Sequence, residues 1–195
     1  SHQFKNLKNV TIDFAQGSWV TVVIGWNGTG KSNVLEALAI IFRDLIAKKR
    51  TPEFAFQLSY CMGAGNDKQR IRIDADPDRK KDAFLIYVTN LKENESNSNI
   101  IDAQDLDVDD TKLSEKPIKL TTFLNSDTQY LPHYVFSYYS GESLRMHEVF
   151  RPYLESYDSK LRNGVDPGLK RLFYAMPVHS QFVLLAFMIQ QSDDV

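Results

Sequence analysis

Alternating apolar and polar residues predict a series of short strands in the first half of the chain. A period of two places successive side chains on opposite faces of a sheet, as a half-buried strand requires. One further run is β-branched and apolar on both faces, which is typical of a buried central strand. The predicted strands are residues 4–7, 10–14, 54–60, 70–73 and 83–88, and the run apolar on both faces is 19–24. Turn-forming residues at 63–67 predict that the strands between residues 54 and 88 form a hairpin or a meander.

Three- and four-residue spacing of apolar positions predicts a helix over residues 33–49. Basic residues at 48–50 suit the negative end of that helix, and Pro52 marks its stop.

The second half of the chain predicts a strand at residues 134–139 and two helical segments. The first helix opens after this strand and carries a broken apolar stripe to Leu154, which Pro152 bends or interrupts. The second covers residues 179–191 and is apolar over most of its length.

Residues 92–116 differ from the rest of the chain in composition. They hold eight acidic residues and three lysines, a net charge of −5, so the remaining residues carry +3. The segment is rich in Asn and Ser and has no aromatic residue. This composition predicts a solvated, flexible acidic insertion, with an acidic docking strip as the alternative.

Overall composition narrows the class of protein. The 195 residues are 43% hydrophobic and 25% charged, which excludes fibrous and wholly disordered proteins. No apolar run reaches the length of a membrane helix, and the first residues contain no apolar signal segment. The single Cys61 suits a reducing compartment, so we expect a cytoplasmic protein without a membrane. The net charge of −2 excludes a wholly basic nucleic-acid binder.

A glycine-rich segment carries the clearest chemistry. Gly25-x-x-x-x-Gly30-Lys31-Ser32 matches the Walker A pattern, with a predicted strand before it and a predicted helix after it. Gly25, Gly28 and Gly30 allow backbone N–H groups to converge on one point, and the following helix adds its positive end. Lys31 is placed to meet the β- and γ-phosphates, and Ser32 offers its hydroxyl to Mg²⁺. The sequence therefore predicts binding of ATP with Mg²⁺.

The residues around this motif extend the interpretation. Residues 3–45, from Phe4-Lys5-Asn6-Leu7 through the motif to Leu38, resemble the start of ABC-type ATPases of the RecF-like, structural-maintenance-of-chromosomes and overcoming-lysogenisation-defect branch. Residues 138–145 and 179–185 look like bacterial AAA-type ATPases found beside restriction systems. Trp26 departs from that pattern, because a bulky ring stands beside the phosphates where Pro, Lys or Glu is more usual.

The resemblance implies an α/β fold: a P-loop NTPase core, with a mostly parallel sheet and flanking helices, plus an antiparallel β-subdomain. That subdomain would contain the early strands and the region 54–88. The motif assigns nucleotide contacts to Asn27, Gly28, Thr29, Gly30, Lys31, Ser32 and Asn33. The family also implies a glutamine near Mg²⁺, for which Gln57 is the candidate. The alternative for Gln57 is a plain exposed residue of an alternating strand.

Two further parts of such an ATPase have no clear match here. Ser140-Gly141-Glu142 lacks the second glycine of a signature motif, and Asp193-Asp194 is separated from its apolar run by three polar residues. We therefore interpret residues 1–195 as the N-terminal part of an ABC-type ATPase domain and identify no catalytic base. The resemblance implies hydrolysis on homodimerisation together with a C-terminal half, little turnover by this chain alone, and a DNA-linked or phage-defence role.

Two other functions remain open at the level of sequence. One is a self-contained P-loop kinase or other phosphotransferase. The other is a nucleotide-gated interaction module without turnover. The basic residues at 68–81 allow a phosphate-backbone contact or a solvated hairpin face, since four aspartates interleave with them. The histidines show no metal-ligand spacing with Cys61.

Overall fold

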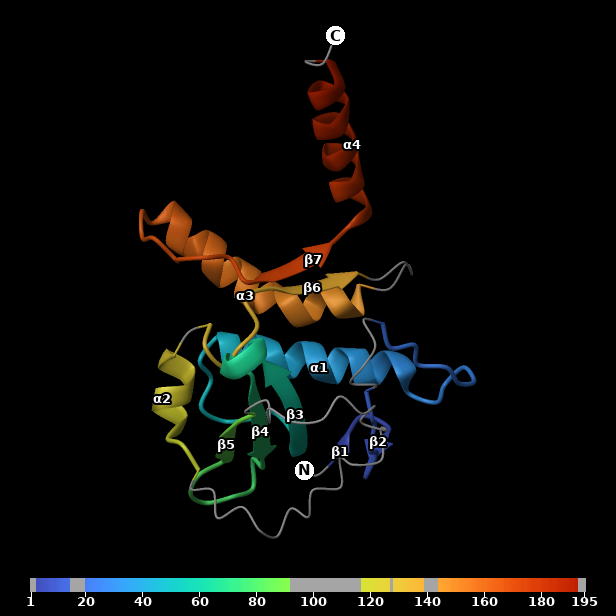
Figure 1. Ribbon diagram of the computed structural model, residues 1–195. Helices are drawn as coiled ribbons and strands as arrows, with labels where there is room; N and C mark the ends of the chain where they lie inside the picture. The colour runs from blue at the N-terminus through green and yellow to red at the C-terminus, as the bar shows by residue number, and fades with distance from the viewer. Residues whose placement is uncertain (1–2, 15–19, 92–116, 127, 139–143, 193–195) are drawn as a thin grey trace. The chain divides into compact units, whose positions relative to one another are not determined.

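The computed structural model describes residues 3–14, 20–91, 117–126, 128–138 and 144–192 (Figure 1). The predicted acidic insertion at 92–116 lies outside these residues. The chain divides into two compact units. Unit 1 comprises Ser1–Asn9 and Lys48–Pro132, and unit 2 comprises Val10–Ala47 and His133–Val195.

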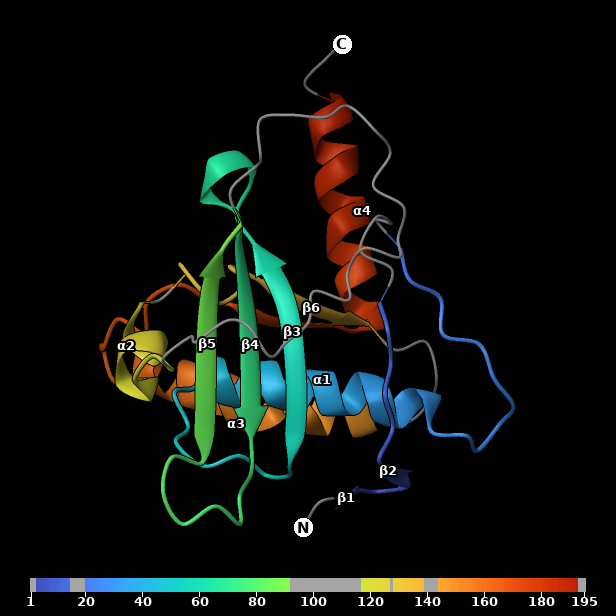
Figure 2. The same ribbon diagram turned by 60° about the horizontal axis from the view of Figure 1, so that its bottom comes forward.

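Unit 1 is organised around a three-stranded antiparallel sheet in the order β3-β4-β5 (Figure 2). The strands are β3 (Phe56–Met62), β4 (Gln69–Ala75) and β5 (Phe84–Asn90), and the 3₁₀ turn Gly65–Asp67 lies between the first two. One face of the sheet is fully buried, with Ile71, Ile73 and Ile86 at 0% exposure. These are the alternating positions that the sequence pattern assigns to the core, so the predicted meander is confirmed.

A short helix, α2 (Leu120–Asn125), packs against β5. Ile118 forms a bridge to Ile86 just before α2, and Phe123 on the helix is fully buried. The Phe123 ring stacks on Tyr130, with centroids 5.8 Å apart. The sequence analysis missed this helix because six residues are too few to show a helical period.

The first residues of unit 1 form a minimal hairpin of β1 (Gln3–Phe4) and β2 (Leu7–Lys8). Phe4 packs against Phe54 with ring centroids 4.5 Å apart. The prediction of a further strand at 10–14 is wrong, because these residues have no regular structure and both Val10 and Phe14 are exposed. Alternation alone does not make a strand where no neighbouring strand pairs with it.

Tyr60 on β3 gives unit 1 a pH-dependent contact. Its hydroxyl donates a hydrogen bond to the Tyr130 carbonyl at 2.7 Å, and burial raises the pKa of this phenol well above its usual value. The unfolded chain releases this proton near pH 10, whereas the folded chain retains it. We therefore expect the free energy of unfolding to fall as the pH rises above about 10. Urea titrations at pH 9 and pH 11 measure this loss.

The matched variant for this prediction is Tyr60→Phe. It keeps the ring and removes the ionisable group, so its stability should change less than that of the wild type between the two pH values. An identical pH response in both proteins would contradict the assignment.

Unit 2 contains a parallel β-α-β arrangement. Strands β6 (Val135–Tyr138) and β7 (Leu172–Ala175) pair in parallel, and α3 (Arg145–Arg162) connects them. α3 packs on β7 and on α1 (Lys31–Ile46), and the core between them includes Phe150 and Leu172 at 0% exposure. β6 confirms the strand predicted at 134–139, whereas β7 was missed by the sequence analysis.

Pro152 lies inside α3, and the helix continues through it to Arg162. Of the two predicted effects of this proline, interruption of the helix is therefore wrong, and a bend stays a prediction. Proline removes the N–H that would bond the Glu148 carbonyl. The buried side chains of Met146, Val149 and Phe150 hold the preceding turn of the helix against its neighbours.

Residues 20–24 differ most from the sequence expectation. They form no strand, and Val20, Val22 and Ile24 are 73%, 71% and 88% exposed. The prediction of a buried central strand over 19–24 is wrong for the described part of that segment. A strand that is apolar on both faces needs neighbours on both sides and cover on both faces, and no described strand pairs with this one.

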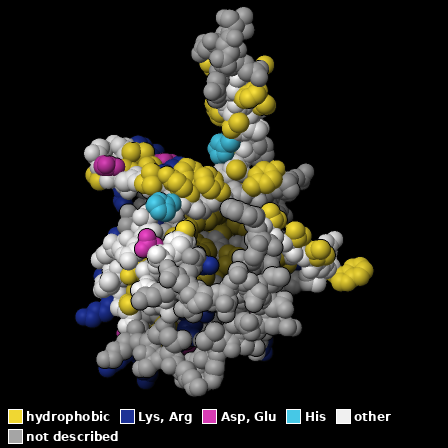
Figure 3. Space-filling view, in the orientation of Figure 1, with side chains coloured by type: hydrophobic (Ala, Val, Ile, Leu, Met, Phe, Trp, Pro, Cys, Tyr) yellow, Lys and Arg dark blue, Asp and Glu magenta, His cyan; other side chains and the backbone are white. Residues whose placement is uncertain are grey.

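The last described element is α4 (Pro177–Ser192), which follows β7 and confirms the predicted C-terminal helix (Figure 1). Figure 3 shows apolar side chains along it, and those of Phe182, Leu184 and Met188 are all more than half exposed. Within the described residues, no helix combines the length and the hydropathy that crossing a membrane requires.

Candidate nucleotide-binding site

The predicted Walker A segment forms a tight loop that leads into α1. Gly28 has φ 84° and Gly30 has φ 99°, both in the left-handed region that glycine adopts without a steric penalty. Within the loop, the backbone N–H of Thr29 and its hydroxyl both donate to the Trp26 carbonyl, at 3.4 and 2.9 Å. These features give the segment a defined turn at the position where the sequence predicts phosphate binding.

Gly25 is required by a close approach across this turn. A Cβ atom at this position would lie 3.0 Å from Thr29 Oγ1 and would also contact the side chain of Lys31. The first glycine of the motif therefore leaves room for two side chains that cross the loop.

Lys31 folds back over the loop that precedes it. Its Nζ donates to the carbonyl of Gly25 at 2.5 Å and to that of Trp26 at 2.7 Å. An ammonium group has three N–H donors, so Lys31 can hold both carbonyls and still donate to a phosphate oxygen. These contacts place the ammonium group of Lys31 at the loop.

The N-terminus of α1 adds to this positive potential. Gly30 is the N-cap residue and provides no side-chain cap, and the first intrahelical bond runs from Val34 N to the Gly30 carbonyl at 3.0 Å. The N–H groups of the first turn precede that bond and have no helical acceptor of their own. The first turn contains no acidic residue that would compete with an anion. Loop, lysine and helix dipole together form an anion-binding arrangement.

The predicted Mg²⁺ contacts have different surroundings. Ser32 is exposed in the first turn of α1, next to Lys31. Gln57 is an exposed residue of β3 in unit 1, opposite Asp74 in the register of the sheet. Among the described residues, no group of three or more His, Cys, Asp or Glu could hold a metal ion. Both Mg²⁺ assignments remain predictions, and Glu142, Asp193 and Asp194 lie outside the described residues.

Arg145 is a further residue beside the site. It begins α3, and its Nη2 donates to Asn33 Oδ1 and to Glu36 Oε2, each at 2.6 Å. Asn33 follows the motif serine directly and is itself one of the residues predicted to contact nucleotide. Arg145 therefore bonds to a residue of the predicted site. The sequence indicates that Asn33 and Glu36 share a face of α1, because they are three residues apart. The sequence analysis includes Arg145 only in the segment 138–145 that resembles AAA-type ATPases, and it gives no indication of a contact with α1, which lies more than a hundred residues away.

The glycine-rich loop, its lysine and the helix that follows define a P-loop nucleotide-binding protein. A family model described as AAA ATPase domain matches residues 3–172. Because this match covers most of the chain, the protein belongs to the AAA ATPase domain family. Searches of curated proteins and of solved structures returned no match.

Membership of this family confirms part of the sequence interpretation. An AAA ATPase domain implies nucleotide binding, usually with Mg²⁺, and suggests hydrolysis of ATP. The mixed α/β architecture agrees with such a domain. The RecF-like, chromosome-maintenance and lysogenisation branch stays a prediction. The match ends within β7, so α4 lies beyond it.

Proposed function

We propose that this chain binds Mg²⁺-ATP through the loop that joins residue 25 to α1. The observation that carries the proposal is Lys31, whose ammonium group lies across the glycine-rich loop at the uncapped N-terminus of a helix. Two sources of positive potential then act on one ligand: the lysine cation, and the N-terminus of α1 with its N–H groups that have no helical acceptor. A triphosphate is the ligand that suits this combination.

Each residue of the loop has a defined role in this proposal. Backbone amides of the loop bind the phosphates, Lys31 neutralises their charge, and the Ser32 hydroxyl contacts Mg²⁺. Bound Mg²⁺ would screen the phosphate charge. For Gln57, a contact with Mg²⁺ rests on the family resemblance alone. The residues proposed to contact nucleotide are Asn27, Gly28, Thr29, Gly30, Lys31, Ser32 and Asn33.

Hydrolysis is proposed to require assembly. ABC-type homodimerisation, together with a C-terminal half, would supply the water-orienting and charge-stabilising groups that phosphoryl transfer needs beyond the P-loop. The exposed apolar residues of unit 2 support such contacts, because surfaces of this kind mark interaction sites. They lie in residues 20–24, on β6 and along α4, with Phe136 at 71% exposure.

The same surfaces support a larger and mostly parallel sheet in the assembled protein. The β6–β7 pair has α3 on one face, where Leu172 and Tyr174 are buried. Aromatic side chains gather on the other face, where Phe136 stacks on Phe173 with centroids 4.9 Å apart. Parallel sheets are normally covered on both faces, so further protein is expected to cover this one.

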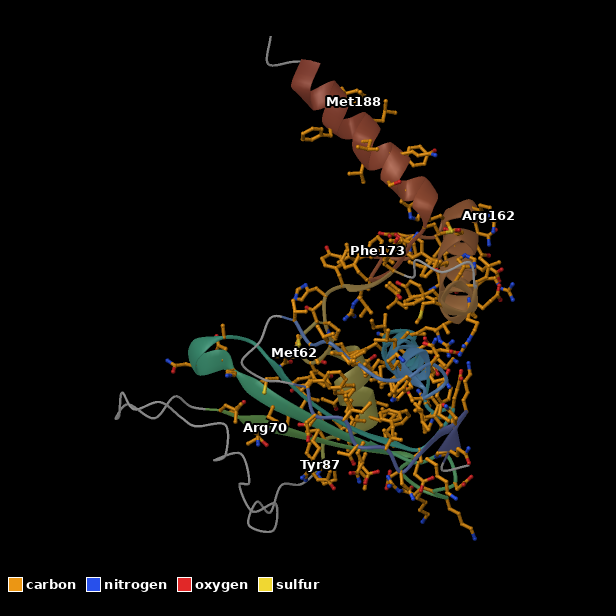
Figure 4. All side chains as sticks on the ribbon, turned by 90° about the vertical axis from the view of Figure 1, so that its right-hand side faces the viewer. Met62, Arg70, Tyr87, Arg162, Phe173 and Met188 are labelled. Atoms are coloured by element: carbon orange, nitrogen blue, oxygen red, sulfur yellow. The ribbon has the colours of Figure 1, made fainter. Side chains whose placement is uncertain are left out.

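A DNA-linked role, including phage defence, is the part of the proposal that rests on resemblance to recombination and restriction-associated ATPases. One feature of unit 1 supports a contact with a polyanion. Arg70 and Arg72 lie on the face of β4 opposite the buried isoleucines, and the Arg72 guanidinium lies 4.7 Å from the centroid of the Tyr87 ring. Arg70 and Tyr87 are labelled in Figure 4. Arginine and an aromatic ring together suit the backbone and bases of nucleic acid.

Ser32→Ala tests the proposed Mg²⁺ contact. Loss of the hydroxyl should weaken ATP binding about tenfold in the presence of Mg²⁺ and leave binding in EDTA unchanged, since the hydroxyl is assigned to the ion. Isothermal titration with and without Mg²⁺ measures the two affinities. Ser59→Ala, at an exposed serine of β3, is the matched control. Equal losses in both buffers would show that Ser32 does not act through Mg²⁺.

A further inference from the structure

Arg145 joins the beginning of α3 to the first turns of α1, next to the proposed ATP site. A single nitrogen, Nη2, donates to Asn33 Oδ1 and Glu36 Oε2, each at 2.6 Å. All three residues belong to unit 2. The contact therefore connects the residue that follows the motif serine with the start of the helix that packs on β7.

The burial of Glu36 explains why this contact is needed. The Glu36 side chain is only 10% exposed, whereas the Arg145 side chain is 52% exposed. A carboxylate removed from water in this way requires an opposite charge or several donors. Arg145 supplies both a charge and a donor, so it fixes the orientation of the second turn of α1 as well as that of Asn33.

Because Asn33 and Glu36 belong to the first turns of α1, the contact with Arg145 also affects the proposed phosphate site. The residues proposed to contact nucleotide extend from the loop into the first turn of α1, where Lys31, Ser32 and Asn33 lie. A binding group is effective when neighbouring contacts hold it in its bound geometry before the ligand arrives. Asn33 and Glu36 lie on the same face of α1, and Arg145 holds both.

We propose that Arg145 is a positioning residue of the nucleotide site, which holds the first two turns of α1 in the geometry that binds phosphate. The inference rests on the proposed ATP-binding function and adds to it a residue outside the motif. Arg145 acts through Asn33 and Glu36 and is assigned no contact with the nucleotide.

A second contact shows that Arg145 is not the main attachment between α1 and α3. Arg43, near the end of α1, donates from Nη1 to the Val149 carbonyl at 3.0 Å, and this contact is buried. Met146, Val149 and Phe150 are also buried on α3. Loss of the Arg145 side chain should therefore leave α3 docked and affect mainly the start of α1.

The test compares Arg145→Gln with Arg145→Lys in ATP titrations on the whole chain. Arg145→Gln should raise the Kd for ATP about tenfold and shift the melting temperature by no more than a few degrees. Arg145→Lys should restore most of the affinity, because an ammonium group also carries a charge and several donors on one nitrogen. Unchanged affinity in Arg145→Gln, or a loss that lysine does not restore, would overturn the proposal.

A stability control separates positioning from a structural role. Val149→Ala removes buried apolar atoms from the same helix, so it should lower the melting temperature and leave the Kd for ATP unchanged. If Val149→Ala weakens ATP binding as much as Arg145→Gln, the effect of Arg145 is merely structural and the proposal fails.

A double-mutant cycle with Glu36→Gln tests the route of the effect. If Arg145 acts through Glu36, the loss in the double variant should be clearly smaller than the sum of the two single losses. Additive losses would overturn that route. Lys31→Ala distinguishes this inference from the function on which it rests. Normal ATP binding by Lys31→Ala removes the proposed site itself, whereas its loss together with normal binding by Arg145→Gln overturns only the role of Arg145.

Discussion

Lys31→Ala is expected to weaken ATP binding at least about 100-fold, which corresponds to ~2.7 kcal/mol. The substitution removes the ammonium group that lies across the loop, and with it the side-chain cation proposed to neutralise the phosphate charge. Its melting temperature should stay close to that of the wild type, because Gly25 and Trp26 are exposed and water can bond their carbonyls. Isothermal titration and thermal denaturation measure the two quantities.

Lys49→Ala is the matched control for this prediction. Lys49 is also exposed, and its Nζ forms an ion pair with Glu53 Oε1 at 3.2 Å, away from the loop in sequence. Like Lys31→Ala, the Lys49→Ala substitution removes one positive charge from the chain. It should leave the affinity for ATP unchanged. Equal affinities of Lys31→Ala and Lys49→Ala would mean that the loop is not the ATP site.

Phe150→Ala is expected to have the largest effect on stability, a loss of about 3–5 kcal/mol in the free energy of unfolding. Phe150 is fully buried on α3 and stacks on Tyr174 of β7 with ring centroids 6.2 Å apart. Its removal leaves a cavity between the connecting helix and the strand that follows it. Urea denaturation followed by far-ultraviolet circular dichroism measures the loss.

Phe136→Ala provides the comparison for this core substitution. Phe136 lies on the exposed face of the β6–β7 pair, so its truncation should change the stability of the chain by less than about 1 kcal/mol. A large loss for Phe136→Ala together with a small loss for Phe150→Ala would reverse the assignment of the two faces.

The sheet of unit 1 could be predicted from sequence because its contacts are local. Alternation assigns each residue of β3, β4 and β5 to a face, and short connections leave antiparallel pairing as the simple solution. The turn at residues 25–30 could also be predicted, since the glycines of the motif indicate where the backbone adopts positive φ. The nucleotide contacts of this loop stay a prediction.

The errors and omissions arise where structure depends on distant residues. The apolar residues at 19–24 indicate that both faces of a strand formed there would be suited to burial. The pattern does not indicate which other segments would pair with that strand. Similarly, β7 shows four apolar residues without a period, and only its parallel register with β6 defines it as a strand. Arg145 was missed for the same reason, because its two acceptors belong to a helix near the other end of the chain.

The resting position of Lys31 has a consequence for how tightly a nucleotide can be bound. A free lysine side chain loses up to about 2 kcal/mol of rotamer entropy when it becomes fixed. Here two carbonyl acceptors within the chain hold the ammonium group. Most of the rotamer entropy of this side chain is therefore lost when the chain folds. Little more of it is lost when ATP binds. A larger share of the electrostatic attraction between lysine and phosphate is then available as affinity.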